Sequence, residues 1–248
     1  MTPTARLYLE QKAKLEKAKP PRVRCLKCRK PEITCYCAGL QPFVSEPQII
    51  ILMHPLEFKH PIGTGRLTHN CLSNSQLWVG TDFANSSQLN SLLADSNNSV
   101  TLLFPNLSSF DLSLMNYAER RSFLDTKKKN VVIVLDATWH LAKKMLHRTP
   151  KLQKIPRICF TPVELSKFIV RKQPHPQCYS TIEAVHEVLS LLNPEGAKKP
   201  QHLLDMFQNM LAKQLSFKNH LRPSRHKKGY ERRKAKTILS PKNGLPAL

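Results

Sequence analysis

Four cysteines near the start of the chain have the spacing of a metal site. Cys25 and Cys28 form one close pair, and six residues separate it from a second pair, Cys35 and Cys37. Two such pairs let two turns present four thiolates to one ion, which is the ligand set of a closed structural zinc site. The sequence predicts a four-cysteine zinc knuckle; the alternative is a group of free structural thiols.

An acid and an aromatic side chain follow the most apolar run in the chain. Residues 131–135 are apolar and mostly β-branched, and Asp136, Thr138 and Trp139 come directly after them. A buried strand that ends in an acid at a strand-to-helix turn is a common active-site position in open α/β sheets. The alternative is that Asp136 caps the next helix while Trp139 fills core.

Polar residues also follow a second apolar run, residues 48–53. His54 and Glu57 come first, and a turn-rich loop containing Thr64 and Arg66 leads into the next helical pattern. Imidazole and carboxylate are metal ligands, but a third ligand at a sensible spacing is missing, so a metal site is disfavoured here.

A third polar group opens a helix near the end of the chain. Ser180, Thr181 and Glu183 form an S-x-x-E capping box before an apolar run. Capping alone would explain Ser180 and Glu183.

Short apolar runs alternate with segments of helical periodicity. The predicted strands cover residues 48–53, 77–80, 100–104, 131–136 and 157–161. The predicted helices cover residues 4–19, 67–72, 83–95, 140–148, 184–192 and 202–215. This alternation predicts an α/β fold with a mainly parallel sheet.

Glycine usage excludes two common nucleotide sites. The chain has seven glycines, and neither G-x-G-x-x-G nor G-x-x-x-x-G-K-[ST] can be assembled from them. A dinucleotide-binding Rossmann site and a P-loop NTPase are both disfavoured on this ground.

The formal net charge of +22 is concentrated at the two ends of the chain. Residues 1–30 carry ten basic and two acidic side chains, and residues 213–248 carry eleven and one. A near-neutral middle with basic ends favours a nucleic-acid partner over a membrane surface, because the C-terminal run lacks an apolar helical face. A solubilising tail is the simpler alternative.

Hydropathy gives no sign of membrane insertion or secretion. The first twenty residues lack the apolar core of a signal peptide, and no run reaches the eighteen or so apolar residues of a membrane span. We expect a cytoplasmic protein that has reduced cysteines and no obligate protein partner.

Four of these motifs occur together and in a recognisable order. They are Cys25-x2-Cys28-x6-Cys35-x-Cys37, His54-Pro-x-Glu57 with Thr64-Gly65-Arg66-Leu67, Asp136-x-Thr138-Trp139, and Ser180-Thr181-x-Glu183-Ala184. This set resembles the DTW-domain family of tRNA-uridine aminocarboxypropyltransferases over about residues 22–215. The resemblance implies a SPOUT-like α/β fold, knotted around an S-adenosylmethionine site, and formation of 3-(3-amino-3-carboxypropyl)uridine in tRNA.

Such a transfer requires a group that removes the proton from uridine N3, and a positioned carboxylate can do this. We assign this role to Asp136, which would also lie at the cofactor, with Thr138 and Trp139 shaping the pocket. Thr64 and Arg66 are candidates for binding the methionine carboxylate or an RNA phosphate.

The remaining cofactor-binding candidates are polar residues at two helix starts. We expect the N-terminus of the helix after Ser180 to donate to the cofactor, with Glu183 recognising its ammonium group. The candidates are Ser180, Thr181, Glu183, His54 and Glu57.

The expected organisation has four parts. A basic N-terminal helix (1–21) precedes the zinc knuckle (22–45), the catalytic domain (46–215) and a basic tail (216–248). Two other functions fit the same motifs: a SPOUT-type RNA methyltransferase, and a non-enzymatic zinc-dependent RNA-binding protein.

Overall fold

The structure is a computed structural model that describes Leu7, Glu10 and residues 23–171, 173–193 and 200–221. The predicted N-terminal helix therefore falls almost entirely outside the described residues, as does the basic tail beyond residue 221. Within the described part, none of the helices combines the length and apolar character needed to span a bilayer.

Six strands form one sheet in the order β2-β1-β5-β3-β6-β4, and every pairing is parallel. The strands are β1 (Gln48–Met53), β2 (Gln76–Val79), β3 (Asn98–Leu103), β4 (Phe110–Asp111), β5 (Lys129–Asp136) and β6 (Arg157–Cys159). The predicted α/β class with a mainly parallel sheet is confirmed. Because all strands run the same way, their carboxyl ends meet at one edge.

Helices cover both faces of this sheet. The longer ones are α3 (Thr64–Cys71), α4 (Ser87–Ala94), α6 (Trp139–Arg148), α8 (Thr181–Leu192) and α9 (Gln201–Leu221). The short ones are α2 (Pro55–Lys59), α5 (Tyr117–Arg121), α7 (Pro150–Gln153), η1 (Glu32–Thr34), η2 (Cys37–Gly39) and η3 (Leu112–Leu114).

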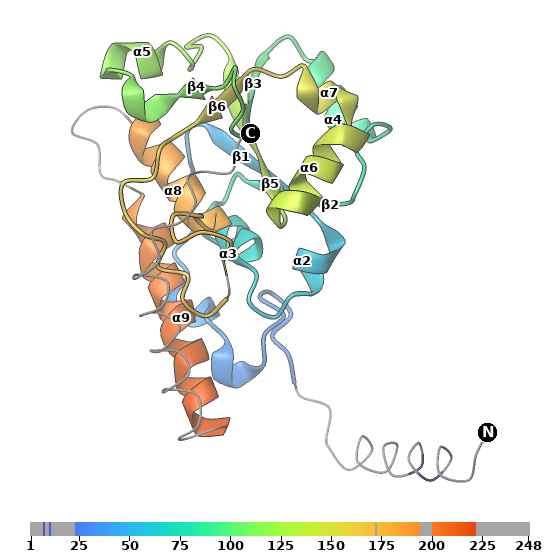
Figure 1. The fold of residues 1–248 in the computed structure, drawn as a ribbon, viewed down its shortest axis with the longest axis vertical. Helices are drawn as coiled ribbons and strands as arrows, with labels where there is room; N and C mark the ends of the chain where they lie inside the picture. Colours follow the sequence, from blue (N-terminus) through green and yellow to red (C-terminus); the bar gives the residue numbers. More distant parts are fainter. Residues whose placement is uncertain (1–6, 8–9, 11–22, 172, 194–199, 222–248) are drawn as a thin grey trace.

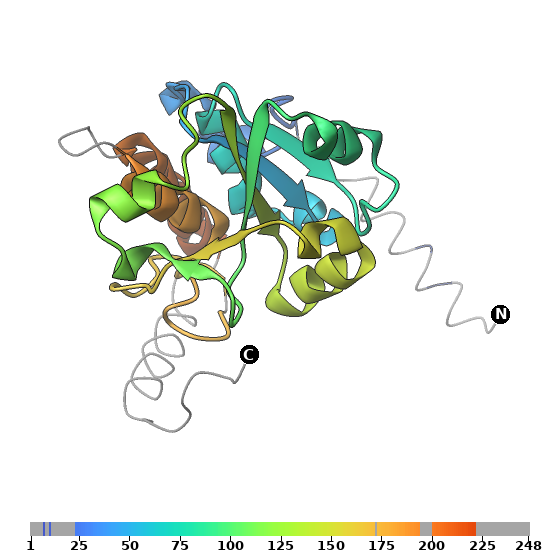
Figure 2. The same ribbon diagram turned by 90° about the horizontal axis from the view of Figure 1, so that it is seen from above.

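Two hydrophobic cores follow from the alternation of side chains along the strands. Ile49 and Ile51 of β1 pack on the side of α3, α8 and α9, whereas Ile50 and Leu52 pack on the side of α4, α6 and α7. Figures 1 and 2 show these two helical layers with the sheet between them. A strand buried on both faces has no polar alternation, which explains its continuous apolar run.

Several predicted element boundaries were wrong: the helix predicted over residues 83–95, for example, spans only Ser87–Ala94 as α4, and strand β4 was not predicted. Helix α3 begins at Thr64 rather than Leu67, although Gly65 lowers the helix propensity there. Strand β6 ends at Cys159 rather than Thr161, because Thr161 donates through its hydroxyl to Asp111 Oδ2 (2.6 Å) and through its backbone N–H to Ser113 Oγ (3.0 Å). Strand β4, with two residues, is too short for periodicity to reveal.

The cysteine-containing segment packs as a small unit against the end of the main domain. It carries η1 and η2, and buried Cys28 and Tyr36 belong to the same hydrophobic cluster as Phe207 of α9. Figure 1 shows this segment beside α9 and below α2 and α3.

Candidate active site at the carboxyl edge of the sheet

The carboxyl ends of the neighbouring strands β1 and β5 lie side by side. Met53 pairs with Asp136 in the parallel register, and the backbone N–H of His54 donates to the Asp136 carbonyl (3.0 Å). The two polar groups that the sequence places after separate apolar runs are therefore brought together. This is the edge at which open α/β sheets bind ligands.

Asp136 is buried, with 5% of its surface exposed. Its Oδ1 accepts a hydrogen bond from Thr181 Oγ1 at the start of α8 (2.5 Å), while Oδ2 is buried without a hydrogen-bond partner among the described residues. Burial raises the pKa of Asp136 to about 6; the Thr181 hydrogen bond opposes this rise and the Glu57 charge adds to it. Asp136 does not cap α6, whose N-cap is Thr138.

Gly65 allows α3 to pass directly over this carboxylate. A Cβ atom at position 65 would lie 2.6 Å from Asp136 Cγ and 2.9 Å from Met53 Cε, closer than van der Waals contact permits. The glycine therefore permits a close approach of helix and strand that a larger residue would prevent.

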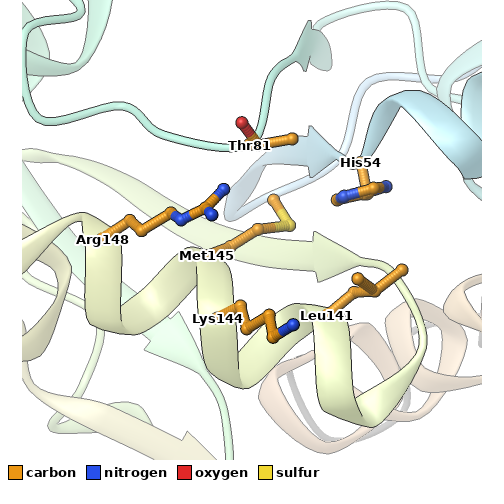
Figure 3. A pocket seen from close by; sticks show the side chains of 6 residues that line it. All are labelled: His54, Thr81, Leu141, Lys144, Met145 and Arg148. Atoms are coloured by element: carbon orange, nitrogen blue, oxygen red, sulfur yellow. The ribbon is translucent and has the colours of Figure 1, made fainter.

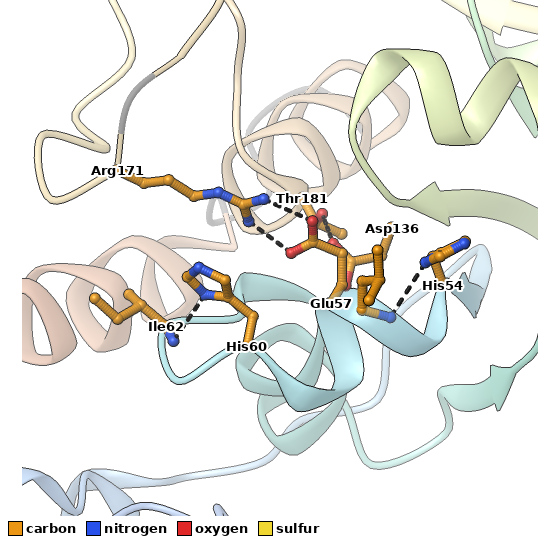
Figure 4. A network of polar contacts seen from close by, with 8 residues as sticks. His54, Glu57, His60, Ile62, Asp136, Arg171 and Thr181 are labelled. Carbon is orange, nitrogen blue, oxygen red and sulfur yellow. Dashed lines mark hydrogen bonds and ion pairs between the residues drawn. The ribbon is translucent and has the colours of Figure 1, made fainter. Parts of the chain in front are cut away.

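A buried ion pair lies next to Asp136. Arg171 donates through both terminal nitrogens to the Glu57 carboxylate (2.5 and 2.6 Å), and this fork joins the segment after β6 to α2 (Figure 4). Glu57 has 6% of its side chain exposed and Arg171 has 28%. The hydrogen bonds to Glu57 raise the pKa of Arg171. The sequence analysis missed Arg171, because a lone arginine in an irregular segment carries no local signal of its partner.

The capping box predicted at the start of α8 is confirmed, and it has a second task. Glu183 Oε2 accepts from the Ser180 backbone N–H (2.8 Å) and from the hydroxyls of Ser180 (2.6 Å) and Ser166 (2.8 Å). Glu183 Oε1 accepts from the Lys167 backbone N–H (2.7 Å). Glu183 thus anchors the segment that carries Arg171, and of the three residues in this motif it is Thr181 that contacts Asp136.

The two residues after Ala137 face outward. Thr138 is exposed, and Trp139 has 44% of its surface exposed, with its ring edge against Phe104 (centroids 5.7 Å apart). The alternative that Trp139 fills core is therefore wrong. A partly exposed indole next to the strand end can stack on a planar ligand.

His54 serves locally as the N-cap of α2, where its Nδ1 accepts from the Leu56 backbone N–H (3.1 Å). Its ring also lines a small pocket of about 140 Å³ at the ends of β1 and β2 (Figure 3). The other lining residues are Thr81, Leu141, Lys144, Met145 and Arg148. This volume is below the roughly 300 Å³ of typical small-molecule sites, so the pocket alone cannot enclose a nucleoside.

Thr64 and Arg66 point to different surroundings. Thr64 is the buried first residue of α3, and its carbonyl accepts from Thr68 Oγ1 (2.9 Å). Arg66 donates to the Phe58 carbonyl (3.1 Å) and lies over the Phe58 ring (4.4 Å), on the side of the cysteine-containing segment. Successive helical residues point about 100° apart, so Arg66 and Gly65 face different partners.

The four N-terminal cysteines form a cluster that could hold a metal ion. The sulfur atoms of Cys25, Cys28, Cys35 and Cys37 all lie within 4.8 Å of one another. Cys25 and Cys37 sulfurs are 3.7 Å apart, and Cys28 and Cys35 sulfurs are 3.6 Å apart. Burial raises the pKa of Cys28 and of Cys37, so a bound cation is needed for all four to be thiolates.

Comparison with known proteins agrees with this geometry. The sequence pattern of the DTW domain matches residues 22–215, from the cysteine-containing segment to α9. The chain belongs to the DTW domain family. The family predicted from the four motifs is confirmed, because this match covers most of the chain.

Curated relatives of this DTW-domain chain carry a common name. A Drosophila melanogaster protein named tRNA-uridine aminocarboxypropyltransferase 2 is 29% identical over 77% of this chain and 78% of its own length. An Arabidopsis thaliana protein named tRNA-uridine aminocarboxypropyltransferase A is 26% identical over 80% of this chain and 83% of its own. A mouse protein with the first name is 24% identical over 75% of this chain and 64% of its own. No solved structure matches the chain.

The close approach at Gly65 predicts a stability effect. Gly65→Ala places a methyl group against Asp136 and Met53, so we expect the free energy of unfolding to fall by about 1–3 kcal/mol in urea denaturation. Gly39→Ala is the matched control, because its new Cβ meets only side-chain atoms at 3.3 Å or more, Met206 Sδ at 3.3 Å and Asn209 Nδ2 at 3.6 Å. Equal stability of both variants would contradict this packing.

The raised pKa of Asp136 predicts a pH-dependent stability. Between the usual value of 3.8 and the folded value of about 6, the folded protein binds more protons than the unfolded chain, so its stability falls as the pH rises through this window. Asparagine does not ionise, so the variant Asp136→Asn does not lose this part of the folding stability as the pH rises. We expect its stability relative to wild type to rise by on the order of 2–3 kcal/mol between pH 4 and pH 8.

Urea denaturation at several pH values measures this difference. The control is Asp82→Asn, which removes an exposed carboxylate that remains hydrated. If the stability difference between Asp136→Asn and wild type did not change with pH, Asp136 would not have the raised pKa that its burial requires.

Proposed function

We propose that this chain transfers the 3-amino-3-carboxypropyl group of S-adenosylmethionine to N3 of a uridine in tRNA. The observation that carries the proposal is the Asp136 carboxylate, buried at the carboxyl edge of the sheet with one oxygen that has no hydrogen-bond partner in the described part of the chain. The names of the relatives identify the reaction class, and they imply tRNA as the substrate.

Asp136 is the proposed general base. Uridine N3 carries a proton at neutral pH, and a carboxylate with a pKa of about 6 is ionised there and still basic enough to accept it. Thr181 holds Oδ1, and Oδ2 has no hydrogen-bond partner among the described residues; because Oδ2 is buried against Gly65, α3 has to shift before Oδ2 can accept the N3 proton. Gly65 leaves no room for Asp136 to rotate toward α3.

The proposed reaction forms one bond and breaks one. S-adenosylmethionine supplies an electrophilic carbon next to its sulfonium. The N3 proton goes to Asp136, N3 bonds to the terminal carbon of the aminocarboxypropyl arm, and the carbon–sulfur electron pair stays on sulfur. The products are 3-(3-amino-3-carboxypropyl)uridine and methylthioadenosine, and alignment of N3 with this carbon supplies much of the acceleration.

The other site residues are proposed either to contact the substrate and the cofactor or to position the residues that do. Trp139, with its exposed indole beside Phe104, is proposed to stack on the uracil, and Thr138 to line the same surface. Thr64, at the start of α3, is proposed to hold the methionine carboxylate with the helix N-terminus.

Residues already paired within the protein are proposed to act by positioning. Ser180 and Glu183 hold the segment that precedes α8, and Glu57 holds Arg171 from the same segment. His54 fixes the start of α2 beside the Asp136 strand. These contacts support a role in shaping the cofactor site rather than in touching the reacting atoms.

We also propose a SPOUT-like knotted topology and a cytoplasmic location. The sheet order supports the first, because β5 returns to a place between β1 and β3, and β6 to a place between β3 and β4. The second rests on tRNA as the substrate.

A mass measurement tests the reaction class. We expect wild-type protein, incubated with unmodified tRNA and S-adenosylmethionine, to add C₄H₇NO₂ to one uridine, with Asp136→Asn lowering the rate at least about 100-fold. The measurements are mass spectrometry of nucleosides and a tRNA-binding assay, in which Asp136→Asn should match wild type.

Each alternative function gives a different outcome. Addition of CH₂ instead would identify an RNA methyltransferase. Wild-type product formation by Asp136→Asn would show that Asp136 is not the base. A non-enzymatic RNA-binding protein would form no product, and its tRNA binding would survive Asp136→Ala but fail in Cys25→Ser.

We propose that the cysteine cluster holds zinc in a structural role. A tetrahedral site with zinc–sulfur bonds of about 2.3 Å places sulfurs about 3.8 Å apart, close to the 3.6 and 3.7 Å observed here. Four protein sulfurs leave no coordination position for a substrate or water.

Metal analysis tests this site. We expect one zinc per chain, and we expect its removal by a chelator under reducing conditions to lower the thermal midpoint reversibly, because the cluster anchors the segment that packs on α9. Cys28→Ser should lose the metal, whereas Cys178→Ser, outside the cluster, should keep it. Iron in place of zinc would refute the assignment.

A further inference from the structure

A second pocket lies between the cysteine-containing segment and α2, away from the residues that contact Asp136. Its volume is about 350 Å³, within the usual range for ligand sites. It is lined by Arg24, Cys28, Arg29, Lys30, Phe58, Lys59, His60, Pro61 and Arg66. We call it the basic pocket.

The basic pocket concentrates positive charge that no carboxylate offsets among the described residues, although the proposed thiolates of the cysteine cluster, which include the lining residue Cys28, offset part of it. Five of its nine lining residues are lysine or arginine, and no acid lines it among the described residues. Over the same part of the chain, no carboxylate forms an ion pair with any of the five. Like charges held this close repel one another, so an anion in the pocket would stabilise the arrangement.

Two of the arginines share one aromatic ring. The guanidinium of Arg29 lies 4.6 Å from the Phe58 centroid, and that of Arg66 lies 4.4 Å from it. Burial, and then the charge of Arg29, lowers the pKa of Arg66. Stacking on the ring orients both guanidinium groups. A guanidinium group held in this way can donate two parallel hydrogen bonds to the oxygens of one phosphate.

The third cation is built into the pocket wall. Lys30 is only 5% exposed, and its ammonium donates to the Pro61 carbonyl (2.9 Å) and lies 5.7 Å from the Tyr36 ring. Burying this charge is costly, and the nearby Cys28 and Cys35 thiolates offset only part of the cost. A bound anion would lower that cost.

The cysteine turn places Arg29 in this position. Arg29 adopts a left-handed backbone conformation (φ 60°), which costs a non-glycine residue on the order of 1 kcal/mol. Its backbone N–H donates to the Cys25 carbonyl (2.8 Å), and the Cys25 N–H donates to the Lys30 carbonyl (2.9 Å). The turn that presents two cysteines therefore also aims two basic side chains at the pocket.

The number and exposure of these cations favour a nucleic-acid backbone over a cofactor carboxylate. One carboxylate needs one arginine, whereas successive phosphates need several cations along an open surface. Arg24, Arg29 and Lys59 are exposed, so an extended chain can reach them. The sequence just before Arg24 is also rich in lysine and arginine.

We propose that the basic pocket binds backbone phosphates of the tRNA substrate, with Arg29 and Arg66 as the main contacts. The identity of the RNA rests on the proposed function, but phosphate binding does not. The cysteine cluster then has a second task beyond stability, because it holds an RNA contact in place.

The test replaces both arginines with glutamine. A control variant loses the same number of positive charges elsewhere on the surface. The double variant Arg29→Gln/Arg66→Gln is matched by Lys127→Gln/Lys128→Gln, whose exposed lysines precede β5 at the opposite, amino-terminal edge of the sheet. Affinity for unmodified tRNA is measured over a series of salt concentrations. Metal content and thermal midpoint are measured for both variants to establish that they fold.

We expect the arginine variant to bind tRNA about 10- to 100-fold more weakly, as two charge-assisted contacts require. The slope of log affinity against log salt should decrease by about two. Its KM for tRNA should rise while kcat stays near wild type, and the lysine variant should change neither. If the double variant does not fold, Arg66→Lys keeps the charge but loses the bidentate fork, so a partial loss of affinity is expected.

Three results would separate the possible failures. Wild-type tRNA affinity and salt slope in the arginine variant would overturn the pocket proposal, even if the protein forms the expected product. Weakened binding without any product from wild type would support the pocket and overturn the proposed function. A thermal midpoint that rises with inorganic phosphate in wild type alone, with unchanged tRNA affinity, would assign the pocket to free phosphate and overturn its role in RNA binding.

Discussion

The site depends on one buried carboxylate that is only partly satisfied. Asp136 ends the central strand β5, where α3 and α8 both press on it: Thr181 donates to one oxygen, and Gly65 lies against the other. Burying an acid in this way costs stability, which is visible in its raised pKa. Buried acids with raised pKa values cluster at functional sites, and the proposed proton transfer from the substrate would use this oxygen.

The irregular segment between β6 and α8 is held by charge rather than by regular structure. Glu183 accepts hydrogen bonds from the middle of this segment and from its end at Ser180, and Arg171 forms a bidentate ion pair with Glu57 of α2. The negative charge of Glu57 also raises the pKa of Asp136. The contacts that fix the segment therefore also influence the pKa of this acid. Structure and electrostatics at this site are therefore coupled.

The cysteine cluster links the site to the proposed RNA surface. It packs on α9 through Cys28 and Tyr36, and the turn between its first two cysteines aims Arg29 toward Phe58 and Arg66. Arg66 follows Gly65 directly in α3, so one helical turn faces the acid on one side and the basic pocket on the other. This arrangement places the basic pocket and the Asp136 carboxylate on two sides of a single short helix.

Composition and pattern determined the α/β class, the central strands and the cysteine cluster, because each depends on residues that are close in sequence. The family motifs also predicted that Asp136 and Thr181 belong to one site, and the structure brings these two side chains into contact. The ion pair of Glu57 with Arg171, the approach of Gly65 and the separation of Arg66 from Thr64 were decided only by the tertiary structure. The first two are contacts between segments that are far apart in the sequence, and the third depends on the direction in which each residue points from α3. Local sequence does not indicate which distant segments pack together.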